Sequence, residues 1–136
     1  MQFKKKKVRF VIFGLGRSGS TLLKQLLDSH PEIHCEGELL NPADKYVANP
    51  LLIKLIYKFP YPFFALRSLL SKKHVYGFTL LFYQYSSPEK LIAKLIKKNW
   101  KVIRIYRENS LDQSLSHLVA EKTKIWHRYD GLEMQT

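Results

Sequence analysis

The sequence is poor in cysteine and in acidic residues. Its 136 residues include one cysteine, and 11 Asp and Glu stand against 23 Lys and Arg, which gives a net charge of +12. A single cysteine excludes a disulfide within these residues and fits a reducing compartment, so we expect a cytoplasmic protein. Because Cys35 has no evident acid–base partner, we interpret it as a packed or surface thiol and not as a nucleophile. The cationic excess favours nucleic acid, an anionic membrane surface or a charged nucleotide as partner.

Long uninterrupted apolar runs are also absent. The N-terminus is basic and then apolar, like a crude signal peptide, but its apolar run is short, contains Arg9 and leads into a glycine-rich loop. We interpret it as a buried first strand. Residues 50–70 are apolar, yet Lys54, Lys58, Arg67 and three prolines interrupt them, so they are not expected to span a membrane.

The chain has enough apolar residues for one packed domain, which we expect to comprise residues 1–136. Apolar segments rich in β-branched and aromatic residues predict parallel strands at Val8–Phe13, Val75–Phe82 and Val102–Tyr106. A further short strand is expected in the segment "EIHCEGELLNPAD". Helical patterns alternate with these strands, so the fold class is α/β, with three layers around a central parallel sheet.

Helices are predicted after the strands. Ser18–Asp28 carries a leucine stripe, a Ser-Pro-Glu start signal opens a helix at "SPEKLIAKLIKKN", and a last helix covers "NSLDQSLSHLVAEKT". The expected apolar stripes of the first two helices are Leu22, Leu23, Leu26 and Leu27, and Leu91, Ile92, Leu95 and Ile96.

Two helices are predicted between the short strand in "EIHCEGELLNPAD" and the strand Val75–Phe82. Helical spacing relates Leu51, Leu52, Leu55, Ile56 and Phe59, and Pro60 and Pro62 are expected to break this helix before a second one at residues 63–71. A basic amphipathic pair of this kind could contact a membrane. We favour the alternative, in which the pair packs against the sheet.

The stretch Gly14–Thr21, "GLGRSGST", follows the first strand and precedes the first helix. Such a loop directs backbone N–H groups and a helix N-terminus at one spot, which binds phosphate or sulfate. The lysine of the ordinary phosphate-binding loop is absent, since Ser20 stands in its place and Arg17 lies within the loop. The strand "KVIRIY" ends in Arg107, where an NTPase would place a metal-binding Asp. We therefore expect a site for an anionic nucleotide and no metal site.

The segment "FVIFGLGRSGSTLLKQLLDSHPEIHCEGELLNP" resembles the N-terminal signature of the sulfotransferase family. These enzymes move a sulfuryl group from 3′-phosphoadenosine-5′-phosphosulfate to a hydroxyl or amine. The resemblance implies this donor as cosubstrate, and a loop for its 5′-phosphosulfate formed by Arg17, Ser18, Gly19, Ser20 and Thr21. Within the family, the sequence resembles bacterial carbohydrate sulfotransferases, including those acting on nodulation factors and trehalose, so a carbohydrate hydroxyl is the expected acceptor.

A second segment, "VIRIYRENSLDQSLSHLVA", is similar to the part of the family that holds the 3′-phosphate through an Arg at a strand end and a Ser in the next helix. Arg107 and Ser116 fall at these positions, and Ser114 is the alternative serine. The planar donor fork of Arg suits a phosphate. Both ends of the donor would then be held from neighbouring strand ends.

Sulfuryl transfer also needs a base for the acceptor hydroxyl. Glu36 and Glu38 follow the first helix, and related enzymes often use a Glu there. We prefer Glu38, because the family's Glu tends to precede apolar residues such as Leu39 and Leu40. The histidines are weaker candidates.

Two features depart from the family's pattern. Thr79 occupies a position where similar bacterial enzymes often carry Lys. Family members are also usually longer and have a C-terminal loop with glycine and lysine that closes over the nucleotide. The resemblance therefore leaves open whether the chain is a fragment and whether it is active alone.

Two other functions compete with sulfuryl transfer. One is a phosphate-loop kinase or NTPase, which the missing lysine opposes, and the other is a non-catalytic basic module. We expect no nucleic-acid partner, because the lysines at 4–7 and at 94, 97 and 98 do not make an evident basic face. Peripheral membrane contact is not favoured, and the oligomeric state is left open.

Overall fold

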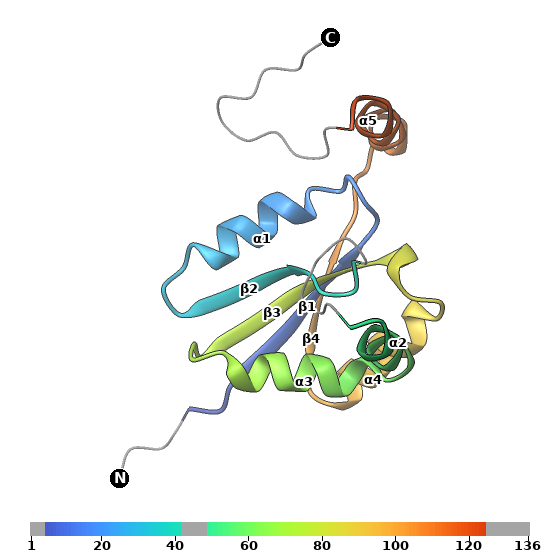
Figure 1. Cartoon of the computed structure of the whole chain (residues 1–136). Helices are drawn as coiled ribbons and strands as arrows, with labels where there is room; N and C mark the ends of the chain where they lie inside the picture. Colours follow the sequence, from blue (N-terminus) through green and yellow to red (C-terminus); the bar gives the residue numbers. More distant parts are fainter. Residues whose placement is uncertain (1–4, 42–48, 125–136) are drawn as a thin grey trace.

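The computed structural model describes residues 5–41 and 49–124. Within them, strands and helices alternate along the chain, as Figure 1 shows. The elements are β1 (Val8–Gly14), α1 (Ser20–Asp28), β2 (Ile33–Glu38), α2 (Pro50–Lys58), α3 (Pro60–Leu70), β3 (Val75–Leu81), a 3₁₀ turn η1 (Phe82–Gln84), α4 (Pro88–Lys97), β4 (Lys101–Ile105) and α5 (Ser110–Thr123).

The strands form one parallel sheet in the order β2-β3-β1-β4. β1 lies at its centre and pairs with β3 from Val8↔Val75 to Gly14↔Leu81, and with β4 from Phe10↔Lys101 to Gly14↔Ile105. The α/β fold and the parallel arrangement of the three main predicted strands are confirmed, and the short strand predicted in "EIHCEGELLNPAD" is β2.

Alternating side chains of the strands supply two apolar layers, because successive residues of a strand point to opposite faces. Phe10, Ile12 and Cys35 are buried on the face covered by α1. On the opposite face the core is larger and includes residues of β1, β3, α3 and α4, and Trp100 between α4 and β4. These residues are Val11, Phe64, Tyr76, Phe78, Leu80, Leu91, Leu95 and Trp100. Helices therefore cover both faces of the sheet (Figure 1).

The leucine stripe predicted for α1 is divided in the structure. Leu23 and Leu27 pack against the sheet, whereas Leu22 and Leu26 are 62% and 61% exposed. The helix begins at Ser20 and not at Ser18, because Gly19 takes a left-handed conformation (φ 94°) at its N-cap. In α4, Leu91 and Leu95 are buried as predicted, but Ile96 is exposed.

The middle helices differ from the prediction in their start and in the side they present to the core. Proline is tolerated in a first helical turn, where N–H groups lack helical partners, so Pro60 and Pro62 lie inside α3. The side of α2 that packs on the core carries Ile56 and Tyr57. Its other predicted apolar positions, Leu51, Leu52, Leu55 and Phe59, are exposed.

Among the helices of the described residues, none combines the length and the apolar character that crossing a bilayer requires.

The sheet order creates a binding position at its carboxyl edge. β1 and β3 are neighbours, yet α1 leaves β1 over one face and α4 leaves β3 over the other. Ligands of open parallel sheets bind at the carboxyl ends of strands where connections diverge in this way. Figure 1 shows α5 beyond the same edge, near the loop between β1 and α1.

Candidate functional site

The loop between β1 and α1 is closely fitted to the strand beside it. Gly14 has no room for a Cβ atom, because the Ile105 carbonyl of β4 lies against it. Arg17 adopts a left-handed conformation (φ 61°), which is uncommon for residues other than glycine. The Ser18 hydroxyl donates to the Leu15 carbonyl (2.7 Å) within the loop. Gly19 then leads into α1, whose N-terminus lies at the loop.

Helix α5 holds this loop from the side. Arg17 Nε donates to Ser116 Oγ (2.9 Å), and Gln113 Nε2 donates to the carbonyl of Gly16 (2.7 Å). The Asn109 side chain caps α5 by accepting from the N–H of Asp112 (3.1 Å). Two segments about a hundred residues apart therefore meet at the loop, as the separation of 99 positions between Arg17 and Ser116 shows.

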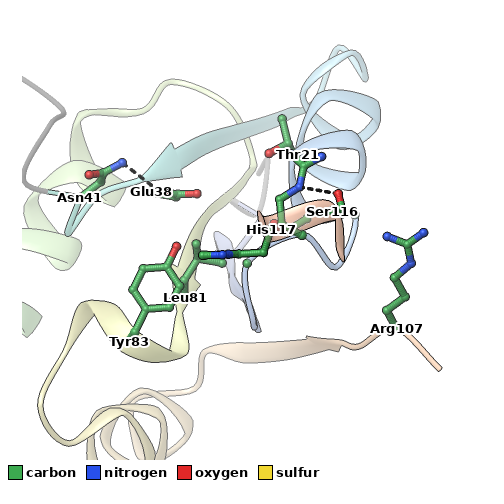
Figure 2. Close-up of a pocket in the computed structure, with 12 residues that line it drawn as sticks. Thr21, Glu38, Asn41, Leu81, Tyr83, Arg107, Ser116 and His117 are labelled. Atoms are coloured by element: carbon green, nitrogen blue, oxygen red, sulfur yellow. Dashed lines mark hydrogen bonds between the residues drawn. The ribbon is translucent and has the colours of Figure 1, made fainter. Parts of the chain in front are cut away.

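A pocket of about 770 Å³ opens between these elements. This volume lies within the range of small-molecule sites, roughly 300–1,000 Å³. Figure 2 shows that its lining comes from the loop, the start of α1, the ends of β2 and β3, the turn η1, the segment after β4, and α5. The lining residues are Gly16, Arg17, Gly19, Ser20, Thr21, Glu38, Asn41, Leu81, Tyr83, Arg107, Ser116 and His117.

Most of the predicted site residues meet at this pocket. Arg107 follows β4 and lies apart from the Ser116 side chain in Figure 2. Ser18 is not among the lining residues, and neither is Ser114, the alternative to Ser116. Thr79, the residue at which the sequence departs from the pattern it resembles, is 3% exposed inside the sheet and does not line the pocket.

Glu38 lies at the pocket with one carboxylate oxygen already held. Its Oε2 accepts from Asn41 Nδ2 (3.0 Å) and from Gln84 Nε2 (2.8 Å). The Gln84 side chain is in turn fixed, because its Oε1 accepts from the N–H of Leu81 (3.0 Å). No described residue donates a hydrogen bond to Glu38 Oε1. The carboxylate is thus oriented by two amides and retains an oxygen that can accept from a ligand.

Glu36 has a different environment, although it is only two residues away. It is 7% exposed, forms an ion pair with Arg67 of α3, and accepts from the Tyr76 hydroxyl (2.7 Å). Burial, and then the Glu36 carboxylate, raise the pKa of Tyr76, so its hydroxyl stays protonated as a donor. Glu36 therefore ties α3 to the sheet and does not line the pocket.

Replacing Glu36 with glutamine is expected to destabilise the fold by about 2–4 kcal/mol, because a buried ion pair loses its charge on one side. The change should be measured as a lower midpoint of urea unfolding. Glu32→Gln is the matched control, since Glu32 is an exposed carboxylate just before the same strand. Unchanged stability of Glu36→Gln would contradict the structural role of this pair.

Cys35 is 1% exposed in the layer below α1. Burial raises the pKa of its thiol to about 12, so the reactive thiolate is scarce at neutral pH. The interpretation of Cys35 as a packed thiol is confirmed.

Four polar lining or supporting residues were not predicted as site residues: Asn41, Tyr83, Gln84 and His117. The motif that contains Asn41 was part of the family resemblance, whereas Tyr83 and Gln84 lie in a 3₁₀ turn that has no sequence signature. Partial burial and the nearby Glu38 raise the pKa of Tyr83, which favours its neutral phenol. Among the described residues, no cluster of three or more His, Cys, Asp and Glu side chains is placed to hold a metal.

The fold and the site together define a phosphate-loop-like α/β protein with a cationic pocket at the carboxyl edge of its sheet. A model of the sulfotransferase family matches residues 9–54. This segment holds the loop from Arg17 to Thr21 and also Glu38, whereas Arg107 and Ser116 lie outside it. No curated protein matches the chain.

Proposed function

We propose that the chain is a sulfotransferase that moves a sulfuryl group from 3′-phosphoadenosine-5′-phosphosulfate to a hydroxyl. As the acceptor we propose a carbohydrate. The observation that carries the proposal is the meeting of an arginine-containing phosphate loop and an oriented carboxylate at one pocket. The family match over residues 9–54 covers both.

The chemistry of the lining fits a donor with negative charge at both ends. Arg17, the hydroxyls of Ser20 and Thr21, and the N-terminus of α1 suit the 5′-phosphosulfate. Arg107 and Ser116 suit the 3′-phosphate, from the end of β4 and from α5. Ser18 would contribute through its backbone, since its hydroxyl already bonds within the loop.

The reaction needs three conditions at one place: an oriented acceptor hydroxyl, a base within reach and cations on the leaving side. When bound, the donor supplies an activated sulfuryl group with a phosphate as leaving group. Glu38 Oε1 takes the proton of the acceptor hydroxyl while the hydroxyl oxygen forms its bond to sulfur and the bond from sulfur to the leaving phosphate breaks. Asn41 and Gln84 keep the carboxylate oriented through Oε2. Arg17 stabilises the negative charge that develops on the leaving phosphate.

A phosphate-loop NTPase is the second candidate, and the arrangement favours it less. Its loop lysine is replaced by Ser20, and Glu38 is the single carboxylate among the described lining residues. Two amides already occupy one oxygen of that carboxylate.

We propose the cytoplasm as the compartment, in keeping with the single buried cysteine.

Direct transfer is tested by incubating the intact chain with 3′-phosphoadenosine-5′-phosphosulfate and a panel of mono- and oligosaccharides. A product heavier by one sulfuryl group, together with release of 3′,5′-adenosine bisphosphate, is the expected result. Hydrolysis of ATP–Mg²⁺ without sulfuryl transfer would instead support the NTPase.

Replacing Arg107 with alanine is expected to weaken the binding of 3′,5′-adenosine bisphosphate far more than the binding of adenosine 5′-phosphosulfate, which lacks the 3′-phosphate. A lost charge-assisted hydrogen bond predicts about a tenfold or larger change for the first ligand. Calorimetric titration of Arg107→Ala with both nucleotides measures the difference. Arg104→Ala is the matched control, because Arg104 is exposed on β4, three residues before Arg107, and does not line the pocket. Equal losses for the two nucleotides would place the contact elsewhere.

A further inference from the structure

Seven large apolar side chains of α2, α3 and their junction point to solvent. Leu51 and Leu69 are 74% and 78% exposed, although each lies in a helix that packs on the core with its other side. We name the whole set the α2–α3 face: Leu51, Leu52, Leu55, Phe59, Leu66, Leu69 and Leu70.

The exposed residues form one stripe on each helix. Positions 51, 52, 55 and 59 lie within about 100° of one another at 100° per residue, and so do positions 66, 69 and 70. The opposite side of α3 holds Phe64 and Ser68, which are 0% and 1% exposed. The core therefore uses one side of each helix and leaves a second apolar side without a partner among the described residues.

The charge around the α2–α3 face has one sign. Residues 45–88 contain no Asp or Glu, and Lys54, Lys58 and Lys72 are exposed beside the stripes. Lys58 lies over the ring of Phe59 (5.6 Å). Two more exposed lysines reach the start of α3 from α4, since Lys94 and Lys98 lie over the ring of Tyr61 at 5.6 Å and 5.7 Å.

We propose that the α2–α3 face docks the protein on the surface of an anionic lipid bilayer. The aliphatic side chains would enter the boundary between headgroups and acyl chains, and the lysines would contact anionic headgroups. The strength of such binding grows with the buried apolar area and with the attraction to anionic lipids, and this face combines both. The helices pack against the sheet with their other sides, as expected, and the proposal adds a second role to them.

The same features favour lipid over other occupants. A second copy of the chain meeting this face with its own would bring two sets of lysines together, which like-charge repulsion opposes. Single-stranded nucleic acid is held by exposed aromatic platforms, whereas six of the seven residues of the face are leucines. In the docked protein, α1 would still face the solvent, because it lies on the opposite face of the sheet (Figure 1).

The test is co-sedimentation of the intact chain with vesicles of phosphatidylcholine alone and of an equimolar mixture with phosphatidylglycerol. We expect binding to the mixed vesicles, weakened by salt. The double variants Leu51→Gln/Leu55→Gln and Leu69→Gln/Leu70→Gln should each lower the partition coefficient about tenfold or more, and Lys54→Glu/Lys58→Glu should do the same. These side chains are exposed, so circular dichroism should show an unchanged fold.

Leu22→Gln/Leu26→Gln is the matched control, because these α1 leucines are similarly exposed (62% and 61%) but lie outside the α2–α3 face. It should bind vesicles like the parent chain. No binding to mixed vesicles, or an equal loss in the α1 control, overturns the proposal. The proposal is also overturned if sedimentation equilibrium shows a dimer and the substitutions in the α2–α3 face dissociate it, because this face then binds a second copy of the chain. None of these results depends on nucleotide binding or sulfuryl transfer.

Discussion

Glu38→Gln is expected to lower the rate of sulfuryl transfer about 100-fold or more while nucleotide affinity stays nearly unchanged. Glutamine keeps the shape of the side chain and can still form hydrogen bonds, but it cannot take a proton from the acceptor. The amides of Asn41 and Gln84 both donate to Oε2, so the carbonyl oxygen of the glutamine can keep both contacts while its NH2 group replaces the proton-accepting Oε1. Turnover under saturating donor, together with a separate binding titration, distinguishes a lost base from a lost binding site.

The two neighbouring carboxylates provide the control for this experiment. Glu36→Gln should unfold more readily but retain transfer at temperatures where it is folded, because Glu36 faces Arg67 and Tyr76. Glu32→Gln, on the exposed start of the same segment, should change neither stability nor rate. Full activity of Glu38→Gln with an inactive, folded Glu36→Gln would assign the base to Glu36.

Arg17→Ala is expected to raise the barrier to transfer by about 3 kcal/mol, which is a rate loss of roughly 100-fold. The Arg17 side chain lies in the phosphate loop, and its Nε donates to Ser116 Oγ. This hydrogen bond orients the guanidinium before the sulfuryl donor binds. A preoriented cation stabilises developing charge more than one that must reorganise. The measurement is single-turnover transfer in Arg17→Ala against the parent chain.

Arg17→Lys and Lys24→Ala separate the possible causes of the loss. Lysine restores the charge without the planar donor fork, so partial recovery is expected. Lys24→Ala removes one positive charge from α1 away from the described pocket lining and should leave the rate unchanged. Equal rates for Arg17→Ala and the parent chain would contradict the role of Arg17 on the leaving side.

Much of the fold could be predicted because its signals are local. The apolar runs of β1, β3 and β4, and the glycine pattern after β1, follow from side-chain type and spacing alone. The side that α2 presents to the core could not be predicted in this way. This helix is apolar almost all round, so periodicity does not determine whether Leu51 and Leu55 or Ile56 and Tyr57 face the sheet.

The choice between Glu36 and Glu38 also depended on a feature that sequence does not reveal. In a regular strand, residues two apart point to the same side. The pairing of β2 with β3 is irregular between Cys35 and Glu38, and the two carboxylates have different partners. Glu36 meets Arg67, whereas Glu38 meets Gln84. A β-bulge of this kind re-aims a side chain near a site, and its position depends on the neighbouring strand.

The most direct test of the central claim is a calorimetric titration of the intact chain with 3′,5′-adenosine bisphosphate and, separately, with ATP–Mg²⁺. The pocket lining of Arg17, Thr21, Arg107 and Ser116 predicts binding of the bisphosphate at least about tenfold tighter, because ATP lacks a 3′-phosphate. Arg107→Ala should remove this preference. Tighter binding of ATP–Mg²⁺, or no difference between the two nucleotides, would contradict the assignment of the pocket to the sulfuryl donor.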